Sequence, residues 1–156
     1  MMNLRKATIS DMPELRDLYQ QTIRTVNSQD YNAAQIAAWS GRGDRLSSLE
    51  NKINTQHFFV AETPDKVITG FASLEDDGEL DMMFVHKDCQ RQGIATLLAN
   101  HIIQTARELG IPVLTAYVSI TARLFFEKIR FRVVREQSVN IDGVELTNYQ
   151  MDYLVI

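Results

Sequence analysis

The sequence predicts an α+β fold with a mixed, mainly antiparallel central sheet of about six to seven strands and helices on both faces. Three strand-like segments follow one another at short turns in the middle of the chain, which indicates an antiparallel meander. A helix then joins the last of them to a further strand, as in a βαβ unit. Two more strands close the chain across the turn Asp142-Gly143, a typical hairpin turn.

The N-terminal third of the chain is predicted to be mainly helical after one short strand, Asn3–Thr8. Asp11-Met-Pro-Glu14 has the features of a helix start, because an Asx residue caps free amides, proline fits the first turn and a glutamate follows. Apolar residues then recur at helical spacing. A second short helix, AAQIAAW, is expected after Asn32, and a further one over Leu46–Ile53.

The remaining two thirds alternate between strands and two helices. The predicted strands are Phe58–Glu62, Val67–Leu74, Leu80–Val85, Pro112–Val118, Phe131–Glu136 and Val144–Tyr153, and the predicted helices are Gly93–Leu109 and Thr121–Ile129. A doubly wound nucleotide-binding fold would alternate strands and helices throughout, so the order favours the α+β class. The length, residues 1–156, fits one domain.

Composition narrows the possible partners. A net charge of -4, without clustered Lys and Arg, argues against nucleic acid. A single cysteine, Cys89, and three dispersed histidines predict no metal site and no internal disulfide. No apolar stretch reaches the length of a membrane span, and the N-terminus has no signal-peptide pattern. We therefore expect no membrane partner and a cytoplasmic location.

The loop before the longest helix carries the candidate binding motif, QRQGIA over Gln90–Ala95. Free amides at a helix start bind anions, Gly93 lets the backbone approach a phosphate, and Arg91 adds a positive charge. The segment lacks both G-K-[ST] and GxGxxG, which excludes the usual nucleoside-triphosphate and dinucleotide loops. Taken alone, one glycine before a helix is also what a plain β–α turn contains.

The wider pattern resembles the GNAT superfamily of N-acetyltransferases over the whole chain. V-x-x-x-x-Q-R-x-G-I-A-x-x-L is similar to its acetyl-CoA motif, (Q/R)-x-x-G-x-(G/A). ELDMMFVHKDCQ resembles the strand that leads into that motif, and SITARLFFEKIRF (Ser119–Phe131) resembles the second cofactor motif. The segments QIAAW and SITARLFFEK resemble the YafP-like bacterial subgroup.

The resemblance implies that acetyl-CoA is the acyl donor and that three segments hold it. The strand would splay from its neighbour and hold the pantetheine arm, the loop and helix start would hold the pyrophosphate, and the next helix would pack against the CoA arm. In that order the residues are Met83, Phe84 and Val85; Gln90, Arg91, Gln92, Gly93, Ile94, Ala95 and Thr96; and Ser119, Ala122, Phe125 and Phe126. The Met83 N–H would polarise the acetyl carbonyl, as an oxyanion-hole donor does.

Two carboxylates are candidates for the general base that deprotonates an amine. Glu79 and Asp81 lie two apart on a predicted strand and so share a face, which Met83 and Val85 would continue. Glu79 matches the position of the glutamate base in many GNAT enzymes, and Asp81 matches the acid of the YafP-like pattern; we favour Asp81 slightly. Alternatively, both are solvated residues at the end of a strand.

The group that protonates the departing thiolate is harder to assign. Phe126 occupies the place of the tyrosine that many GNAT enzymes use, and phenylalanine has no proton to donate. Water, Tyr117 or Tyr149 could serve instead, or the thiolate could leave unprotonated. Arg130 replaces the usual glycine before Phe131, which leaves the local turn geometry open.

In this fold the acceptor pocket lies between the first two helices and the last hairpin, which makes Tyr31 and Trp39 candidates to line it. We expect an enzyme that acetylates a primary amine by direct attack in a ternary complex. The alternatives are an acyl-CoA-binding sensor with little turnover, which Phe126 would favour, and a nucleotide-binding α/β protein. The identity of the amine stays open, and a homodimer is possible.

Overall fold

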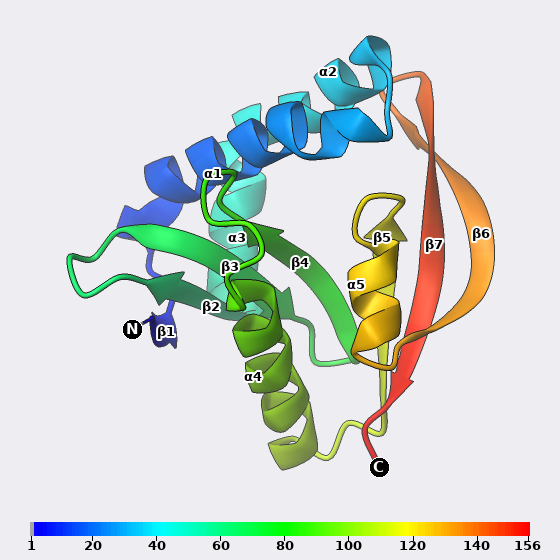
Figure 1. Cartoon of the computed structure of the whole chain (residues 1–156). Coiled ribbons are helices and arrows are strands. Elements are labelled where there is room, and N and C mark those ends of the chain that lie inside the picture. The colour runs from blue at the N-terminus through cyan, green and yellow to red at the C-terminus, as the bar shows by residue number, and fades with distance from the viewer. Residues whose placement is uncertain (1) are drawn as a thin grey trace.

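The computed structural model describes residues 2–156, in which seven strands form one sheet. The strand order is β1-β2-β3-β4-β5-β7-β6 (Figure 1). Within the described residues every pair of neighbouring strands is antiparallel except β4 and β5. The strands are β1 (Asn3–Lys6), β2 (His57–Glu62), β3 (Ile68–Leu74), β4 (Glu79–Val85), β5 (Val113–Ser119), β6 (Arg132–Ile141) and β7 (Val144–Leu154).

Helices cover both faces of this sheet, as the sequence predicts. The helices are α1 (Met12–Thr25), α2 (Ala33–Gly41), α3 (Leu46–Thr55), α4 (Ile94–Glu108) and α5 (Arg123–Lys128). One buried cluster packs side chains of α1 and α2 on one face, and a second packs those of α4 and α5 on the other (Figure 1). The predicted α+β class is therefore confirmed.

The capping residues explain where the second helix begins. The Asn32 side chain accepts a hydrogen bond from the Gln35 backbone N–H at 2.9 Å, and the Gln35 side chain accepts one from the Asn32 N–H at 2.9 Å. This reciprocal pair satisfies two amides that a helix start leaves free. The predicted start of α2 is confirmed, and the third helix expected over Leu46–Ile53 is also present.

The C-terminal hairpin turns at Asp142-Gly143 as predicted, but its first strand is longer than expected. β6 continues from Glu136 to Ile141, with register partners as far as Val144. The segment Gln137–Ile141 contains three polar residues, so its strand signal is weak in isolation. Pairing with β7 supplies the hydrogen bonds that keep it extended.

A β-bulge in β4 overturns one prediction about the site. Ser73 pairs with Met82 and Leu74 with Leu80, so Asp81 is the extra residue on β4. Asp81 and Met82 consequently lie on the same face, the face of α1 to α3, whereas Met83 packs into the cluster on the α4 face. The expectation that Met83 and Val85 continue the face of Glu79 and Asp81 is wrong, because the bulge interrupts the alternation.

β4 and β5 separate soon after they begin to pair. Their register includes Glu79 with Thr115 and Leu80 with Ala116 and goes no further. The backbone of β4 beyond Leu80 therefore has no strand partner on the β5 side. This splay of β4, which the sequence predicts around Met83–Val85, opens the centre of the sheet.

Candidate active site

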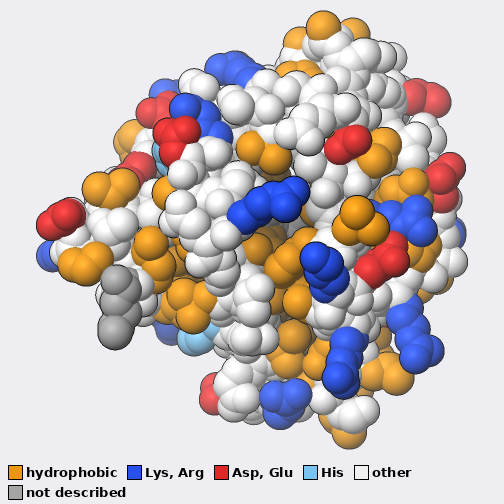
Figure 2. Space-filling view, viewed as in Figure 1, with side chains coloured by type: hydrophobic (Ala, Val, Ile, Leu, Met, Phe, Trp, Pro, Cys, Tyr) orange, Lys and Arg blue, Asp and Glu red, His pale blue; other side chains and the backbone are white. Residues whose placement is uncertain are grey.

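A cleft of about 1750 Å³ occupies the gap between the diverging strands. Its walls come from β4, β5 and β7, from α1 and α3, from the start of α4 and from α5. Figure 2 shows Lys and Arg side chains gathered on the face between α4 and α5, with hydrophobic side chains among them. Four basic residues line this part of the cleft, namely Lys87, Arg91, Arg123 and Lys128.

The start of α4 lies at the cleft and leaves backbone amides without partners. Gly93 has a φ of +82°, a left-handed conformation that glycine adopts without strain. The first helical hydrogen bond runs from Leu97 N–H to the Gly93 carbonyl at 3.0 Å, and no side chain caps the helix. The amides of Ile94, Ala95 and Thr96 therefore remain free to bind an anion.

The space in front of these amides suits a phosphate group. A Cβ atom added to Gly93 would meet nothing within 4 Å, so the backbone there is open to a ligand. The Gln90 side chain donates to the Val85 carbonyl at 2.8 Å and the His86 carbonyl at 3.3 Å, which ties the loop to the end of β4. Free amides, an open approach and nearby cations fit the pyrophosphate of acetyl-CoA.

The structure brings the predicted donor-binding residues together around one cleft, apart from Gln92, which does not line it. Phe126 is 5% exposed and makes edge-on contacts with Phe125 and Phe131 at centroid distances of 5.6 and 5.0 Å. Its ring therefore also contributes to the core beneath α5. Which atoms contact the donor stays a prediction.

The acid pair lies where β4 and β5 begin to separate, and its two members have different environments. Asp81 accepts hydrogen bonds from Lys52 Nζ at 2.5 Å and Gln56 Nε2 at 2.9 Å. Burial raises the pKa of Glu79 to about 7, helped by the negative charges of Asp81, Glu75 and Asp77. Lys52 and Asp81 form an ion pair, whereas Glu79 has no cationic partner among the described residues.

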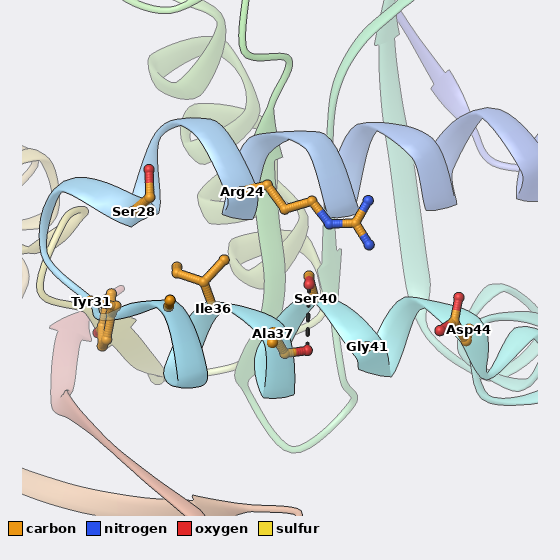
Figure 3. A pocket seen from close by; sticks show the side chains of 9 residues that line it. Arg24, Ser28, Tyr31, Ile36, Ala37, Ser40, Gly41 and Asp44 are labelled. Atoms are coloured by element: carbon orange, nitrogen blue, oxygen red, sulfur yellow. Dashed lines mark hydrogen bonds between the residues drawn. The ribbon is translucent and has the colours of Figure 1, made fainter.

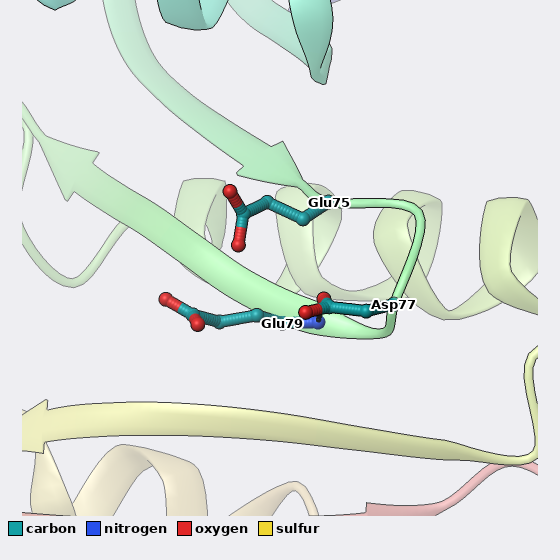
Figure 4. A group of neighbouring side chains, drawn as sticks. All are labelled: Glu75, Asp77 and Glu79. Carbon is teal, nitrogen blue, oxygen red and sulfur yellow. Dashed lines mark hydrogen bonds between the residues drawn. The ribbon is translucent and has the colours of Figure 1, made fainter.

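Glu75, Asp77 and Glu79 come together at the β3–β4 turn, each with a carboxylate oxygen within 4.8 Å of the others (Figure 4). Figure 4 shows Glu75 and Glu79 extending in the same direction from neighbouring strands. The sequence predicts no metal site, and three neighbouring carboxylates, of which only Asp77 is exposed, do not define one by themselves. Its physical effect on the site is to help raise the pKa of Glu79.

An aromatic cluster forms the wall above β4. Tyr19 and Trp39 both contact Phe84, at centroid distances of 4.9 and 6.5 Å, and Trp39 contacts Tyr31 at 5.5 Å. Tyr31 is only 8% exposed. Its hydroxyl donates to the Thr147 carbonyl at 2.6 Å and accepts from the Ile120 N–H at 3.0 Å. Tyr31 and Trp39 both line the cleft, while their place in an acceptor pocket stays a prediction. Tyr31, which lies just before α2, also joins this segment to β7.

A second, smaller cavity of about 610 Å³ lies between α1 and α2 (Figure 3). The residues that line it include Arg24 of α1, Ser28 and Tyr31 from the segment between the two helices, and Ile36 and Ser40 of α2. Of these residues, Tyr31 also lines the main cleft. This cavity contains none of the predicted donor-binding or catalytic residues.

Two tyrosines were candidates to protonate the leaving thiolate, and the structure separates them. Tyr117 lines the cleft and is 46% exposed. Tyr149 lies outside the residues that line the cleft, and the Arg123 guanidinium stacks on its ring at 4.5 Å. Cys89 lines the cleft as well, but burial and the negative charge of Asp88 raise the pKa of its thiol. A raised pKa disfavours the thiolate that a covalent mechanism needs.

Several polar residues of the site escape sequence-based prediction. Arg16, Arg42 and Lys52 line the cleft beside the acid pair, and Gln56 donates to Asp81. They come from α1 to α3 and the segment between α2 and α3, and no local motif surrounds them. Their role depends on how these helices pack over β4, which the sequence pattern does not specify.

The arrangement of the cleft is that of an acyl-CoA-dependent transferase: an anion-binding helix start, splayed strands and a carboxylate at their junction. The family model described as "Acetyltransferase (GNAT) domain" matches residues 27–153. The chain belongs to this family.

Individual proteins that are similar to this chain are also described as N-acetyltransferases. The chain is 28% identical over 152 residues to the N-acetyltransferase YafP of Escherichia coli (strain K12), itself described as uncharacterized. The match covers 97% of this chain and 95% of that protein, which supports a YafP-like member of the family. The GCN5-related N-acetyltransferase structure from Rhodopseudomonas palustris, described as "Aminotransferase, Class-II", superposes with a TM-score of 0.93 at 27% identity. That match covers 97% of this chain and 94% of the other.

A more distant structure shares the fold. PaiA N-acetyltransferase from Thermoplasma acidophilum, solved in complex with coenzyme A, superposes with a TM-score of 0.81 at 18% identity over 99% of both chains. Among the described residues, no helix combines the length and apolar character needed to cross a membrane.

Proposed function

We propose that this protein, acting as one domain, transfers the acetyl group of acetyl-CoA to a primary amine by direct attack in a ternary complex. The observation that carries the proposal is the continuous cleft from the free amides of α4 to Glu79, past the unpaired edge of β4. It supplies a site for a phosphate-bearing donor and a base for an amine within one cavity. Solved relatives that contain coenzyme A or acetyl-CoA share this fold.

The acyl donor is a substrate, and the chain holds it in three places. The amides from Arg91 to Thr96 bind the pyrophosphate, the unpaired edge of β4 binds the pantetheine arm, and Ser119 and Ala122 contact the arm from the other side. The Met83 N–H donates to the acetyl carbonyl oxygen, where negative charge develops during attack. Only an interaction that strengthens during attack accelerates the reaction.

The acid pair divides the work of deprotonating the amine. A base is most effective when its pKa lies near the working pH, which favours Glu79 at about 7. Asp81, which is paired with Lys52, supports Glu79 in this role, because the negative charge of Asp81 helps keep the Glu79 pKa high. This pKa favours Glu79 over Asp81 as the base.

In the reaction the neutral amine nitrogen bonds to the carbonyl carbon and the carbon–sulfur bond breaks. The amine proton goes to Glu79, directly or through one water molecule. The CoA sulfur leaves as a thiolate, whose moderate pKa permits this, and takes its proton from water or from the Tyr117 hydroxyl. Phe126 takes no part in proton transfer.

A second candidate function is an acyl-CoA sensor with little turnover, which buried Phe126 in place of a tyrosine favours. Calorimetry with acetyl-CoA, followed by a screen of primary amines for CoA release, separates the two. The enzyme binds acetyl-CoA and releases CoA with an amine, and this release falls about a hundredfold or more in Glu79→Gln. A sensor also binds acetyl-CoA, but its release of CoA is the same in the wild-type protein and in Glu79→Gln. A protein that binds no acetyl-CoA contradicts both.

A further inference from the structure

One end of the cleft carries cationic side chains that the acetyl donor does not need. Arg16 of α1 and Arg42, which follows α2, line it beside Lys52 of α3. Lys52 is paired with Asp81. Among the residues that the structure describes, neither Arg16 nor Arg42 has an acceptor for its guanidinium, and the Arg16 Nε atom is buried without a partner.

A buried guanidinium nitrogen without an acceptor is unfavourable, because it has lost water without gaining a hydrogen bond. Such groups are satisfied in other proteins by carboxylates and phosphates, whose paired oxygens match the planar guanidinium. Arg16 and Arg42, neither of which has an acceptor among the described residues, are therefore available to bind an oxyanion in this cleft.

This cationic end lies close to the acid pair. Tyr19, one helical turn after Arg16, lines the same cleft. Burial raises the pKa of its phenol to about 12, while the charge of Arg42 lowers it and that of Asp81 raises it. The segment Arg42–Asp44 also packs against α1, and Arg16, Arg42 and the acid pair all line this one cleft.

We propose that the acceptor is a small zwitterion: its amine faces Glu79 and Asp81, and its oxyanion, a carboxylate or phosphonate, binds Arg16 and Arg42. The proposal rests on the proposed acetyltransferase function and specifies its substrate class. It disfavours polyamines, because a second ammonium group would meet the arginines.

The test compares acceptors with and without an oxyanion. The twenty standard amino acids are assayed with acetyl-CoA beside their carboxamides, with 2-aminoethylphosphonate as the phosphonate and spermidine as the polyamine. CoA release is followed with a thiol reagent. We expect an acceptor that carries a carboxylate or the phosphonate to give the highest kcat/KM. Comparison of the two identifies which oxyanion the site binds.

Variants then test the two arginines. For the best oxyanion acceptor, Arg16→Gln and Arg42→Gln should each raise KM about tenfold or more, as expected for the loss of a charge-assisted hydrogen bond. Neither should change kcat or the KM for acetyl-CoA, since an interaction made equally in the ground and transition states affects KM alone. Arg24→Gln is the matched control: it removes the same charge from α1 but lies in the smaller cavity (Figure 3).

The outcomes distinguish this inference from the proposed function. Carboxamides or spermidine that outperform every oxyanion, or arginine variants that behave like Arg24→Gln, overturn the inference and leave the acetyltransferase intact. If no amine is acetylated, calorimetry of the CoA-bound protein with N-acetyl amino acids and their amides decides. Tighter binding of the acids that is lost in Arg42→Gln supports the oxyanion site, and equal binding of acids and amides rejects it.

Discussion

The substitution Glu79→Gln tests the proposed base most directly. It keeps the shape of the side chain and removes its ability to accept a proton. Since a positioned general base contributes about a hundredfold or more, kcat with any productive amine should fall by that factor near pH 8. The affinity for acetyl-CoA should stay unchanged, because Glu79 lies at the junction of β4 and β5 and the pyrophosphate amides lie on α4.

The pH dependence makes this prediction more specific. With a pKa of about 7, Glu79 is about one-tenth ionised at pH 6 and about nine-tenths ionised at pH 8. The rate advantage of the wild-type protein over Glu79→Gln should therefore rise about tenfold between these values. Dividing one profile by the other removes the ionisation of the amine itself. An advantage that is constant across this range would refute the assignment of Glu79 as the base.

Asp81→Asn provides the matched perturbation, because it removes a negative charge that helps raise the Glu79 pKa. The midpoint of its profile should move to lower pH while activity at high pH is partly retained. The opposite result, with Asp81→Asn inactive at every pH and Glu79→Gln active, would assign the base to Asp81. Folding of this variant is checked by thermal denaturation, since it leaves Lys52 without its partner.

The substitution Glu79→Gln should lower the activity of the protein but raise its stability above pH 7. The Glu79 pKa lies at about 7 in the folded protein, against 4.5 for an exposed glutamate, so the fold favours the protonated form. The wild-type protein therefore loses stability as the pH rises through this window. At pH 8 Glu79→Gln should be more stable by about 1 kcal/mol after allowing for partial exposure, or about 2–4 °C in Tm. Below about pH 4.5 this difference should vanish.

Substitutions at three further positions test the donor site and the fold. Gly93→Glu should weaken acetyl-CoA binding about a hundredfold or more in calorimetry, because a carboxylate would meet the pyrophosphate; Gly93→Ala, which adds a methyl group and backbone strain but no charge, should weaken it less, and equal affinities of the two variants would contradict the pyrophosphate assignment. Arg130→Gly should stabilise the protein by about 1 kcal/mol in chemical denaturation, since Arg130 has a left-handed φ of +76°; a destabilised variant would show that its side chain outweighs this strain. Gly78→Ala should lower Tm by several degrees, because its Cβ would lie 2.5 Å from the Val113 carbonyl oxygen; an unchanged Tm would show that the turn relaxes freely.

The sequence predicts the fold well because its signals are local and consistent. Strand-like segments between short turns mark the meander, the Asn32 capping pair marks α2, and the glycine before α4 marks the candidate anion site. Arg130 shows the same consistency in another form, since it adopts the left-handed conformation that the usual glycine would take. Each of these features depends on residues within one turn or one strand.

The parts of the site that the sequence does not predict depend on contacts between distant segments. The bulge at Asp81 arises from its pairing with β3, and alternation along β4 alone places Met83 on the wrong face. Lys52 reaches Asp81 from another element, 29 residues away in the chain. Arg16 and Arg42 resemble ordinary surface arginines until packing places them in the cleft.

The short ladder between β4 and β5 has a consequence for motion. The register joins the half of the sheet with β1 to β4 to the half with β5 to β7 at Glu79–Thr115 and Leu80–Ala116. Two stiff half-sheets connected over so short a length can change their mutual angle at little cost in hydrogen bonds. We expect a donor bound between the two halves to set this angle. Binding of acetyl-CoA should then change the space that is left for the amine.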